Sequence, residues 1–137
     1  MIGLLKVVQN QKDDKKLENN EITAENLTKI TNNYVKNIEC LSLDEFSLLE
    51  RKQVLQTMIS KLCIGGTLSL KFINLDMVAN KIHKGELTGQ KYSNILPYMQ
   101  SCWSDKESIE ELKTMPVIIK GLYYDSIYSV VSLERIK

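Results

Sequence analysis

The amino-acid sequence predicts one α/β domain over residues 1–137, with a mainly parallel sheet that ends in an antiparallel hairpin. From Ile38 onward, segments with strand character alternate with amphipathic helical segments, which is the element order of a parallel sheet. Residues 116–137 then contain two strand-like runs separated by a tight turn, and these add an antiparallel edge. A chain of 137 residues is long enough for one shared core but not for two.

Composition narrows the class of protein. Apolar residues make up 43 % of the chain and charged residues 26 %, as in an average folded domain, which excludes wholesale disorder. The 18 basic and 17 acidic residues nearly cancel, so we do not expect a nucleic-acid partner bound through a generally basic surface. No apolar run approaches the roughly 18 residues that cross a bilayer, and the amino terminus lacks the basic start of a secretion signal. Three scattered cysteines and one histidine indicate a cytoplasmic protein without a zinc site.

The first elements are a strand, a loop and a helix. The aliphatic run Ile2–Val8 predicts a strand, and the polar stretch Gln9–Glu21 predicts a loop. Thr23 is a suitable N-cap for a helix. The apolar face of that helix is formed by Leu27, Ile30 and Tyr34.

The next elements are a strand and the longest helix. Residues Ile38–Leu43 predict the strand, and Ser42 followed by Glu45 is a capping box that predicts a helix beginning near Leu43. Gly65-Gly66 is expected to end this helix, because a C-cap favours a residue with positive φ. The apolar stripe of the helix contains Leu48, Leu55, Met58, Ile59 and Leu62.

The remaining elements are a strand, two helices and the terminal hairpin. Residues Thr67–Ile73 predict a strand whose residues Leu68, Leu70 and Phe72 share one face. Asp76 is expected to cap a short helix that Gly85 closes. Residues 86–103 predict a long loop with at most one short helix. Ser104 and Glu107 form a second capping box, and the hairpin turn is expected near Asp125-Ser126.

The run IECLSLDEF, the amphipathic helix and the run SKLCIGGTLSLKFIN together resemble the second half of class I S-adenosylmethionine-dependent methyltransferases. The family typically has a Gly-Gly segment between a helix and the next strand, and Leu62, Gly65, Gly66, Leu68 and Leu70 match it. The sequence is most similar to the short methyltransferase-like proteins of phage genomes. The resemblance implies a shortened Rossmann-like sheet with helices on both faces. Residues 1–36 then replace the usual cofactor-binding half, and residues 37–137 form the family-like second half.

The resemblance also shows which cofactor-binding feature of the family this sequence lacks. In the family a glycine-rich turn contacts the methionine carboxylate of the cofactor. This sequence has no two glycines at that spacing. A strand–helix–strand crossover takes about 30 residues, so the segment before Ile38 accommodates only one strand and one helix. We therefore expect no bound cofactor, no catalytic residues and no metal, in a domain that is not an enzyme. If it is an enzyme, the resemblance implies a methyltransferase dependent on S-adenosylmethionine.

Two groups of side chains are candidates for a site. Asp44, Glu45 and Phe46 lie where the family places residues that face the cofactor, and Phe46 could stack on adenine. Alternatively, the two acids stabilise a helix N-terminus and Phe46 packs in the core. Asn74, Asp76 and His83 have simpler interpretations as capping or solvent-facing residues.

The second group concentrates aromatic and sulfur side chains in the long loop. Tyr92, Tyr98, Met99 and Trp103 are residue types favoured at protein interfaces, although a loop folded over the sheet would bury them instead. Tyr123, Tyr124 and Tyr128 on the hairpin are equally ambiguous. Because shortening a sheet exposes strand edges and apolar faces, we expect a protein partner or a homo-oligomer, for example within a viral particle. The alternative function is a methyltransferase, or a subunit of one, whose cofactor site is completed by a partner chain.

Overall fold

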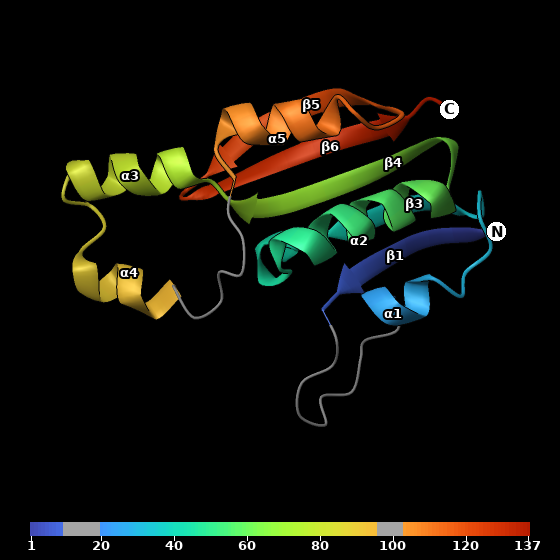
Figure 1. The fold of residues 1–137 in the computed structure, drawn as a ribbon, viewed down its shortest axis with the longest axis horizontal. Coiled ribbons are helices and arrows are strands. Elements are labelled where there is room, and N and C mark those ends of the chain that lie inside the picture. Colours follow the sequence, from blue (N-terminus) through green and yellow to red (C-terminus); the bar gives the residue numbers. More distant parts are fainter. Residues whose placement is uncertain (10–19, 96–102) are drawn as a thin grey trace.

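The computed structural model describes residues 1–9, 20–95 and 103–137. It is built around one six-stranded sheet with the strand order β2-β1-β3-β4-β6-β5 (Figure 1). The strands β2, β1, β3 and β4 run parallel to one another. Strand β6 pairs antiparallel with both β4 and β5. The predicted fold class, a mainly parallel sheet with a C-terminal antiparallel hairpin, is thereby confirmed. The strands are β1 (Ile2–Val8), β2 (Glu21–Thr23), β3 (Val35–Cys40), β4 (Leu62–Ile73), β5 (Val117–Asp125) and β6 (Tyr128–Arg135).

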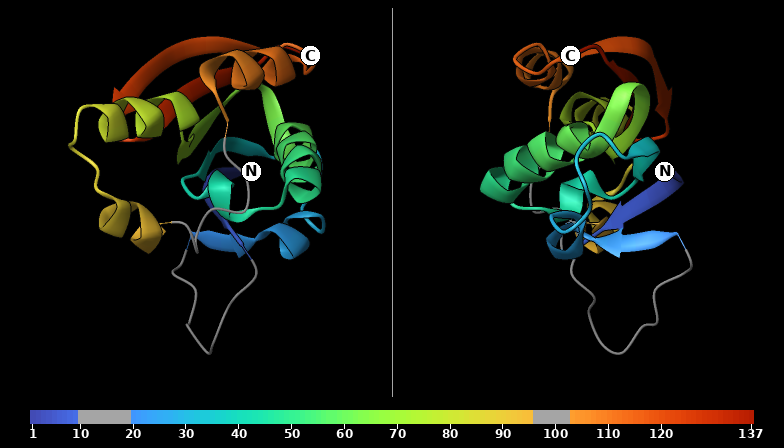
Figure 2. Two further views of the ribbon diagram at one scale, coloured as in Figure 1. Left: turned by 60° about the vertical axis from the view of Figure 1, so that its left-hand side comes forward. Right: turned by 90° about the vertical axis from the view of Figure 1, so that its right-hand side faces the viewer.

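The helices are short except for one of 14 residues that follows β3. They are α1 (Ala24–Leu27), the 3-10 turn η1 (Leu43–Glu45), α2 (Leu48–Lys61), α3 (Leu75–His83), α4 (Gly89–Ile95) and α5 (Asp105–Leu112). The two further views show α1, α2 and α5 on the same side of the sheet (Figure 2). Their apolar residues and those of the sheet form one large buried cluster.

A row of apolar side chains crosses four strands on this covered face. Leu5 pairs with Ile38, Ile38 with Leu68, and Leu68 with Leu133. Paired residues point to the same face of a sheet, so the four side chains form a continuous floor for the helices. Leu68 and Leu133 are completely buried.

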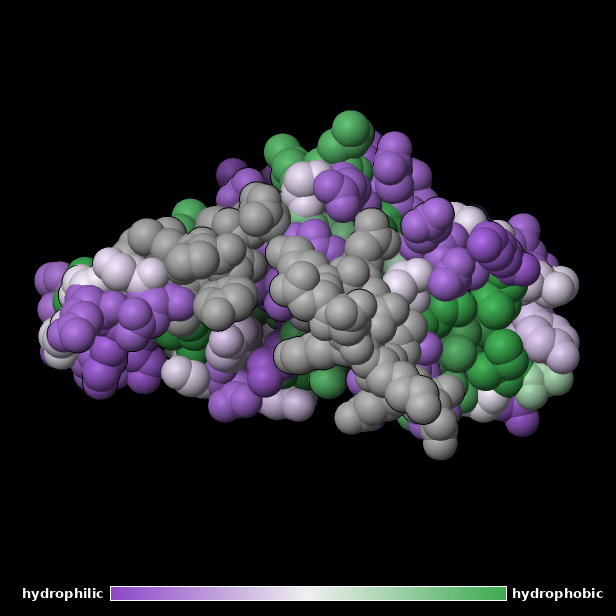
Figure 3. All heavy atoms as spheres, turned by 90° about the horizontal axis from the view of Figure 1, so that it is seen from below, coloured by the Kyte–Doolittle hydropathy of each residue, from purple (hydrophilic) through white to green (hydrophobic). Residues whose placement is uncertain are grey.

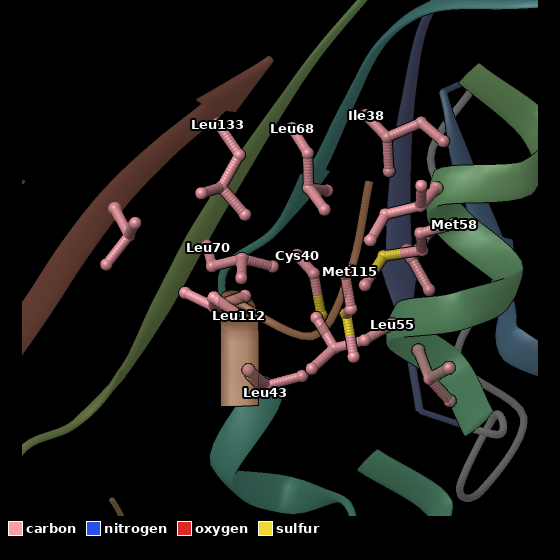
Figure 4. Packing of buried hydrophobic residues seen from close by; sticks show 14 of the residues in the cluster. Ile38, Cys40, Leu43, Leu55, Met58, Leu68, Leu70, Leu112, Met115 and Leu133 are labelled. Carbon is pink, nitrogen blue, oxygen red and sulfur yellow. The ribbon is translucent and has the colours of Figure 1, made fainter. Parts of the chain in front are cut away.

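Helix α2 supplies most of the cover. Figure 4 shows Leu68 and Leu70 of β4 facing Leu55 and Met58 of α2, with Leu112 of α5 beside them. All five are buried. The stripe predicted for the long helix is therefore correct at Leu55, Met58 and Ile59. It is wrong at its ends, because Leu48 is exposed and Leu62 belongs to β4.

On the opposite face, the described helix α3 covers the carboxyl end of β4. Ile73 pairs with Tyr128 and, since side chains alternate along a strand, both point away from the face that holds Phe72. Val78 of α3 packs there against Ile73 and Ile127. Helices therefore lie on both faces: α1, α2 and α5 cover one face, and α3 packs at one end of the other.

The second face also carries a polar row. The row next to the apolar one consists of Lys6, Glu39, Ser69 and Ser132, all half-buried. Such side chains can remain in contact with water, as on the solvated face of many sheets. The expectation that a shortened sheet exposes an apolar face is wrong for this row. On the underside of the molecule, hydrophobic residues gather instead toward the end where β1 and α1 lie (Figure 3).

The long helix begins later than predicted. Ser42 makes no side-chain capping hydrogen bond, and residues Leu43–Glu45 form only a 3-10 turn. The N-cap is Ser47, whose hydroxyl accepts a hydrogen bond from the Glu50 amide at 3.3 Å. Burial explains the delay, because Leu43 and Phe46 both turn into the core before the helix starts.

The glycine pair has a different position from the one predicted. Helix α2 ends at Lys61 and β4 begins at the next residue, so Gly65 and Gly66 lie inside the strand. The pairing of β4 with β3 is irregular there, and Gly65 has a φ of +83°. A Cβ on Gly66 would lie 2.8 Å from the carbonyl oxygen of Cys63, which leaves room only for glycine. The prediction of a positive-φ glycine was correct, but it serves a strand irregularity rather than a helix end.

Helix α1 is shorter than predicted. Thr23 caps it as expected, accepting a hydrogen bond from the Asn26 amide at 3.2 Å, but the helix ends at Leu27. The ammonium group of Lys61 donates to the Asn32 side-chain oxygen at 2.7 Å and to the Thr28 carbonyl at 3.3 Å. These hydrogen bonds hold the chain after α1 in a non-helical course.

The cap of α3 is also shifted. Asn74, not Asp76, is the N-cap, and its side-chain oxygen accepts from the amides of Asp76 and Met77. Gly85, with a φ of +72°, follows the end of the helix as predicted. The capping box of Ser104 and Glu107 on α5 is confirmed in both directions.

Candidate functional site

The carboxyl ends of three neighbouring parallel strands meet at one edge of the sheet. They are the ends of β1 at Val8, β3 at Cys40 and β4 at Ile73. Open α/β sheets bind their ligands at this edge. The predicted residues Asp44, Glu45 and Phe46 follow directly after β3, so the structure brings them to the edge where a ligand is expected.

Asp44 is a buried carboxylic acid at this edge. Its pKa is raised from 3.8 to about 6, chiefly by burial and also by the neighbouring Glu45 carboxylate. Its own backbone amide, the Ile73 amide and the Lys71 ammonium group act in the opposite direction. The hydrogen bond to Ile73 joins the turn after β3 to the end of β4. Asp44 therefore has a structural function at this edge, independent of any ligand.

Three further polar groups lie beside Asp44. The Lys71 ammonium nitrogen is 4.6 Å from the centre of the Tyr128 ring and 3.8 Å from a carboxylate oxygen of Asp125. Burial, Asp44 and Asp125 together raise the pKa of the Tyr128 hydroxyl, so it stays protonated. The protonated Tyr128 hydroxyl and the Lys71 ammonium group can both donate hydrogen bonds.

A cleft of about 590 Å³ lies between α1 and α2, next to the residue that follows β1. This volume is in the range of small-molecule sites. Phe46 and Val54 are buried and line its apolar part, whereas Glu25 and Glu50 are exposed on α1 and α2. The other lining residues are Gln9, Ala24, Thr28, Gln53, Gln56 and Thr57.

Two hydroxyl groups of this lining are already used as donors. The Thr28 hydroxyl donates to the Glu25 carbonyl at 2.7 Å, and the Thr57 hydroxyl donates to the Gln53 carbonyl at 2.9 Å. Their oxygens therefore face other groups only as acceptors. Among the residues that the structure describes, the charged side chains of this lining are the carboxylates of Glu25 and Glu50.

Of the three predicted cofactor residues, only Phe46 lines the cleft. It is buried in the main core cluster, in agreement with its alternative interpretation as a core contact. Glu45 is half-buried in the 3-10 turn. The proposal that these residues contact a cofactor remains a prediction.

The predicted interface role of Trp103 is wrong for the surface of this chain. Its side chain is 1 % exposed and contacts Phe72 edge to face, with ring centres 4.9 Å apart. The guanidinium carbon of Arg51 lies 3.9 Å from the centre of the Trp103 ring. A carboxylate oxygen of Glu111 lies 3.7 Å from a guanidinium nitrogen of the same arginine. The Trp103 backbone also forms a bridge with Asn74 at the end of β4. Trp103 thus fills the core, which was the alternative interpretation from the sequence.

The other predicted interface residues cannot be placed in the same way. Tyr92 belongs to α4, but its side chain is outside the described residues, as are Tyr98 and Met99 entirely. Their proposed role remains a prediction. His83 lies exposed in the last turn of α3, as its solvent-facing interpretation expected.

The largest run of exposed apolar side chains in one element lies on β5. This surface, here called the β5 edge, was visible in the sequence only as an ambiguous tyrosine cluster. Tyr123 is the most exposed of its members at 62 %. The set comprises Ile118, Ile119, Leu122, Tyr123 and Tyr124.

The described part of the chain contains neither a cluster of metal-binding side chains nor a helix that could span a membrane. Within it, no three His, Cys, Asp or Glu side chains gather in a group that could hold a metal ion. Within the same residues, no helix combines the length and the hydropathy needed to span a membrane.

Comparisons with known proteins identify the fold but not a family. No family model matches the sequence, and no curated protein is similar to it. Solved structures match the fold at 11 to 12 % sequence identity. One is a possible exported protein from Bordetella parapertussis, with a TM-score of 0.62 over 86 % of this chain and 45 % of that one. A second is a possible histamine N-methyltransferase, dependent on S-adenosylmethionine, from Thermotoga maritima, with a TM-score of 0.60 over 84 % of this chain and 62 % of that one.

A third similar structure is the CurJ carbon methyltransferase, with a TM-score of 0.58 over 99 % of this chain and 49 % of that one. The chain therefore spans less than two thirds of each of these proteins. At such low identity the likeness shows the fold alone. That fold is Rossmann-like and of the methyltransferase type.

Proposed function

We propose that this chain is a non-catalytic methyltransferase-like domain whose function is to bind another polypeptide, either a second copy or a component of a larger assembly such as a viral particle. The observation that supports the proposal best is the β5 edge. It carries five large apolar side chains that are 40 % exposed or more, among them Tyr123 and Leu122. Exposed apolar side chains gathered on one edge strand of a small domain are typical of an interaction surface.

The chemistry of the cleft supports the non-catalytic part of the proposal. The methionine carboxylate of S-adenosylmethionine needs backbone N–H donors or a cation, and each charge-assisted hydrogen bond contributes about 1.5–3 kcal/mol. The described lining of the cleft presents the carboxylates of Glu25 and Glu50 instead, and it includes neither glycine nor a basic residue among residues 1–9, 20–95 and 103–137. A cofactor bound there by this chain alone would lack its strongest anchor.

Isothermal titration with S-adenosylmethionine and with its demethylated product tests the non-catalytic part. We expect no binding tighter than about 1 mM, which corresponds to roughly −4.1 kcal/mol. The binding part is tested by sedimentation of the purified chain and of the chain with co-purifying proteins. A chain that remains a monomer and associates with nothing would contradict the proposal.

A methyltransferase whose cofactor site is completed by a partner chain is the second candidate. It is favoured by the position of the cleft, because Gln9 follows β1 and Phe46 follows β3, at the edge where this kind of sheet binds ligands. An affinity for either nucleoside better than about 100 μM, roughly −5.5 kcal/mol, would favour this candidate.

A further inference from the structure

The cleft between α1 and α2 has no assigned occupant under the proposed function. Its volume of about 590 Å³ lies in the range of binding sites. The two helices lie on the same side of the sheet (Figure 2), and the buried side chains of Phe46 and Val54 form the inner, apolar part of the cleft. Ala24, half-buried on α1, extends this apolar part. An occupant that covers it therefore carries an apolar group of its own.

The described lining of the cleft is negatively charged. Each of the two helices contributes one exposed carboxylate, Glu25 from α1 and Glu50 from α2. The Glu50 carboxylate accepts a hydrogen bond from the Ser47 hydroxyl at 2.9 Å, and a carboxylate has further lone pairs for other donors. Complementary charges steer association and exclude wrong partners, so these two carboxylates favour a positively charged occupant.

The hydroxyl groups of the lining point to the same chemistry by a separate property. The Thr28 and Thr57 hydroxyls already donate to backbone carbonyls of their own helical turns. Each can therefore offer only lone pairs to an occupant. Ammonium and guanidinium groups are donors without any acceptor, and they match such a lining. Charge and hydrogen bonding thus both favour a lysine or arginine side chain.

The amide side chains of the lining favour a polypeptide over a small amine. They come from Gln9, Gln53 and Gln56. A glutamine amide has both a donor and an acceptor, as a peptide group does, so it can bind the main chain of a peptide at either group. A simple amine has no acceptor for the glutamine N–H groups, whereas a peptide carbonyl has one.

We propose that the cleft binds a basic segment of another polypeptide, in which an apolar side chain lies between lysines or arginines. The apolar side chain packs on Phe46 and Val54, and the basic side chains reach Glu25 and Glu50. This inference rests on the proposed function as a polypeptide-binding domain and names the chemistry of the partner. None of the described lining residues belongs to the β5 edge, so the two surfaces can be tested separately.

The first test is fluorescence anisotropy of a short labelled peptide in which lysine and leucine alternate, titrated with the full chain. We expect saturable binding with a dissociation constant below about 100 μM, and weaker binding at high salt. The same peptide with glutamate in place of lysine should not bind below about 1 mM. Spermine, a cation without apolar side chains or peptide groups, should not displace the lysine peptide below about 1 mM.

The second test places the peptide in the cleft. Gln53→Lys adds a positive charge to the lining and should weaken binding of the lysine peptide about three- to tenfold. Leu48→Lys is the matched control, because Leu48 is 66 % exposed on the same helix but does not line the cleft. Glu25→Gln should weaken binding about two- to fivefold, whereas Glu110→Gln, exposed on α5, should leave it unchanged.

Equal affinity for the lysine and glutamate peptides, or no saturable binding of either, would overturn the inference. Displacement by spermine at the concentration of the peptide would replace the polypeptide by a small amine, and equal effects of Gln53→Lys and Leu48→Lys would place the peptide elsewhere. Both results contradict the inference. The proposed function fails separately, if the chain sediments as a monomer that associates with no protein or binds S-adenosylmethionine tightly.

Discussion

The two faces of the sheet differ although the same strands form both. On one face Leu5, Ile38, Leu68 and Leu133 lie in a row on the side of the sheet that α1, α2 and α5 cover. The polar row of Lys6, Glu39, Ser69 and Ser132 lies on the opposite side from these three helices. A small domain buries a limited share of its surface, and this chain concentrates its apolar residues on one side. Its stability is therefore expected to depend on the covered face, and its contacts with other chains on the β5 edge.

The largest expected effect comes from truncating the covered row. Leu68→Ala removes a completely buried side chain and should lower the free energy of unfolding by about 2–5 kcal/mol. Ser69→Ala, at the next residue on the open face, should change it by less than about 0.5 kcal/mol. Urea unfolding of both variants checks this difference, and equal effects would show that the faces are not energetically distinct.

A second substitution tests how closely the covered face is packed. Gly66→Ala would place a Cβ 2.8 Å from the Cys63 carbonyl oxygen and 3.0 Å from that of Lys36, both of them backbone atoms that cannot move aside easily. We expect a loss of about 1–3 kcal/mol in thermal or urea unfolding. Gly3→Ala is the control, because its Cβ would meet open space. If Gly66→Ala is as stable as the control, the close approach of β3 and β4 is not as described.

Asp44, at the edge where the parallel strands end, makes a pH-dependent contribution to the stability of the fold. Its pKa is raised in the folded protein, from 3.8 to about 6, so the folded state binds the proton more tightly than the unfolded state. Its contribution to stability therefore falls as the pH rises from about 4 to 6, and stays low above 6. Asp44→Asn should remove the part of the pH dependence of stability that comes from this carboxyl group. Melting temperatures of both proteins between pH 4 and 7.5 give the difference, and parallel curves would contradict the assignment.

The smallest effect is expected on the open face. Lys6→Ala should change the free energy of unfolding by less than about 0.5 kcal/mol, because Lys6 is half-buried and belongs to a row of polar side chains. Chemical unfolding measures it. A loss above about 2 kcal/mol would mean that Lys6 has a buried function that its exposure does not suggest.

Local patterns predicted much of the fold. The strand Ile2–Val8, the hairpin and the capping box at Ser104 depend on residues close in sequence, and the structure reproduces them. The alternation in Thr67–Ile73 of polar residues with Leu68, Leu70 and Phe72 also indicated a strand with one solvated face, whereas strands covered on both faces tend to be continuously apolar. The unequal cover of the sheet was therefore readable from this run.

The sequence predictions are wrong where contacts between residues far apart in the sequence determine the structure. Ser42-x-x-Glu45 and Ser47-x-x-Glu50 are the same capping signal, and only the burial of Phe46 between them selects the second. The burial of Trp103 depends on Arg51, which approaches from α2. An arginine four residues before Leu55, on the core-facing stripe, was the available signal for a buried partner. The cleft needed α1 and α2 side by side, which no local pattern contains.

The most direct measurement is a titration of the isotope-labelled chain with S-adenosylmethionine, followed through the backbone amide signals of Phe46, Glu50 and Val54 around the cleft. If this domain acts through polypeptide contacts, these signals should not shift in saturable fashion below about 1 mM nucleoside. Saturation with a dissociation constant under about 100 μM would mean that the domain holds the cofactor by itself, and the account given above would be wrong.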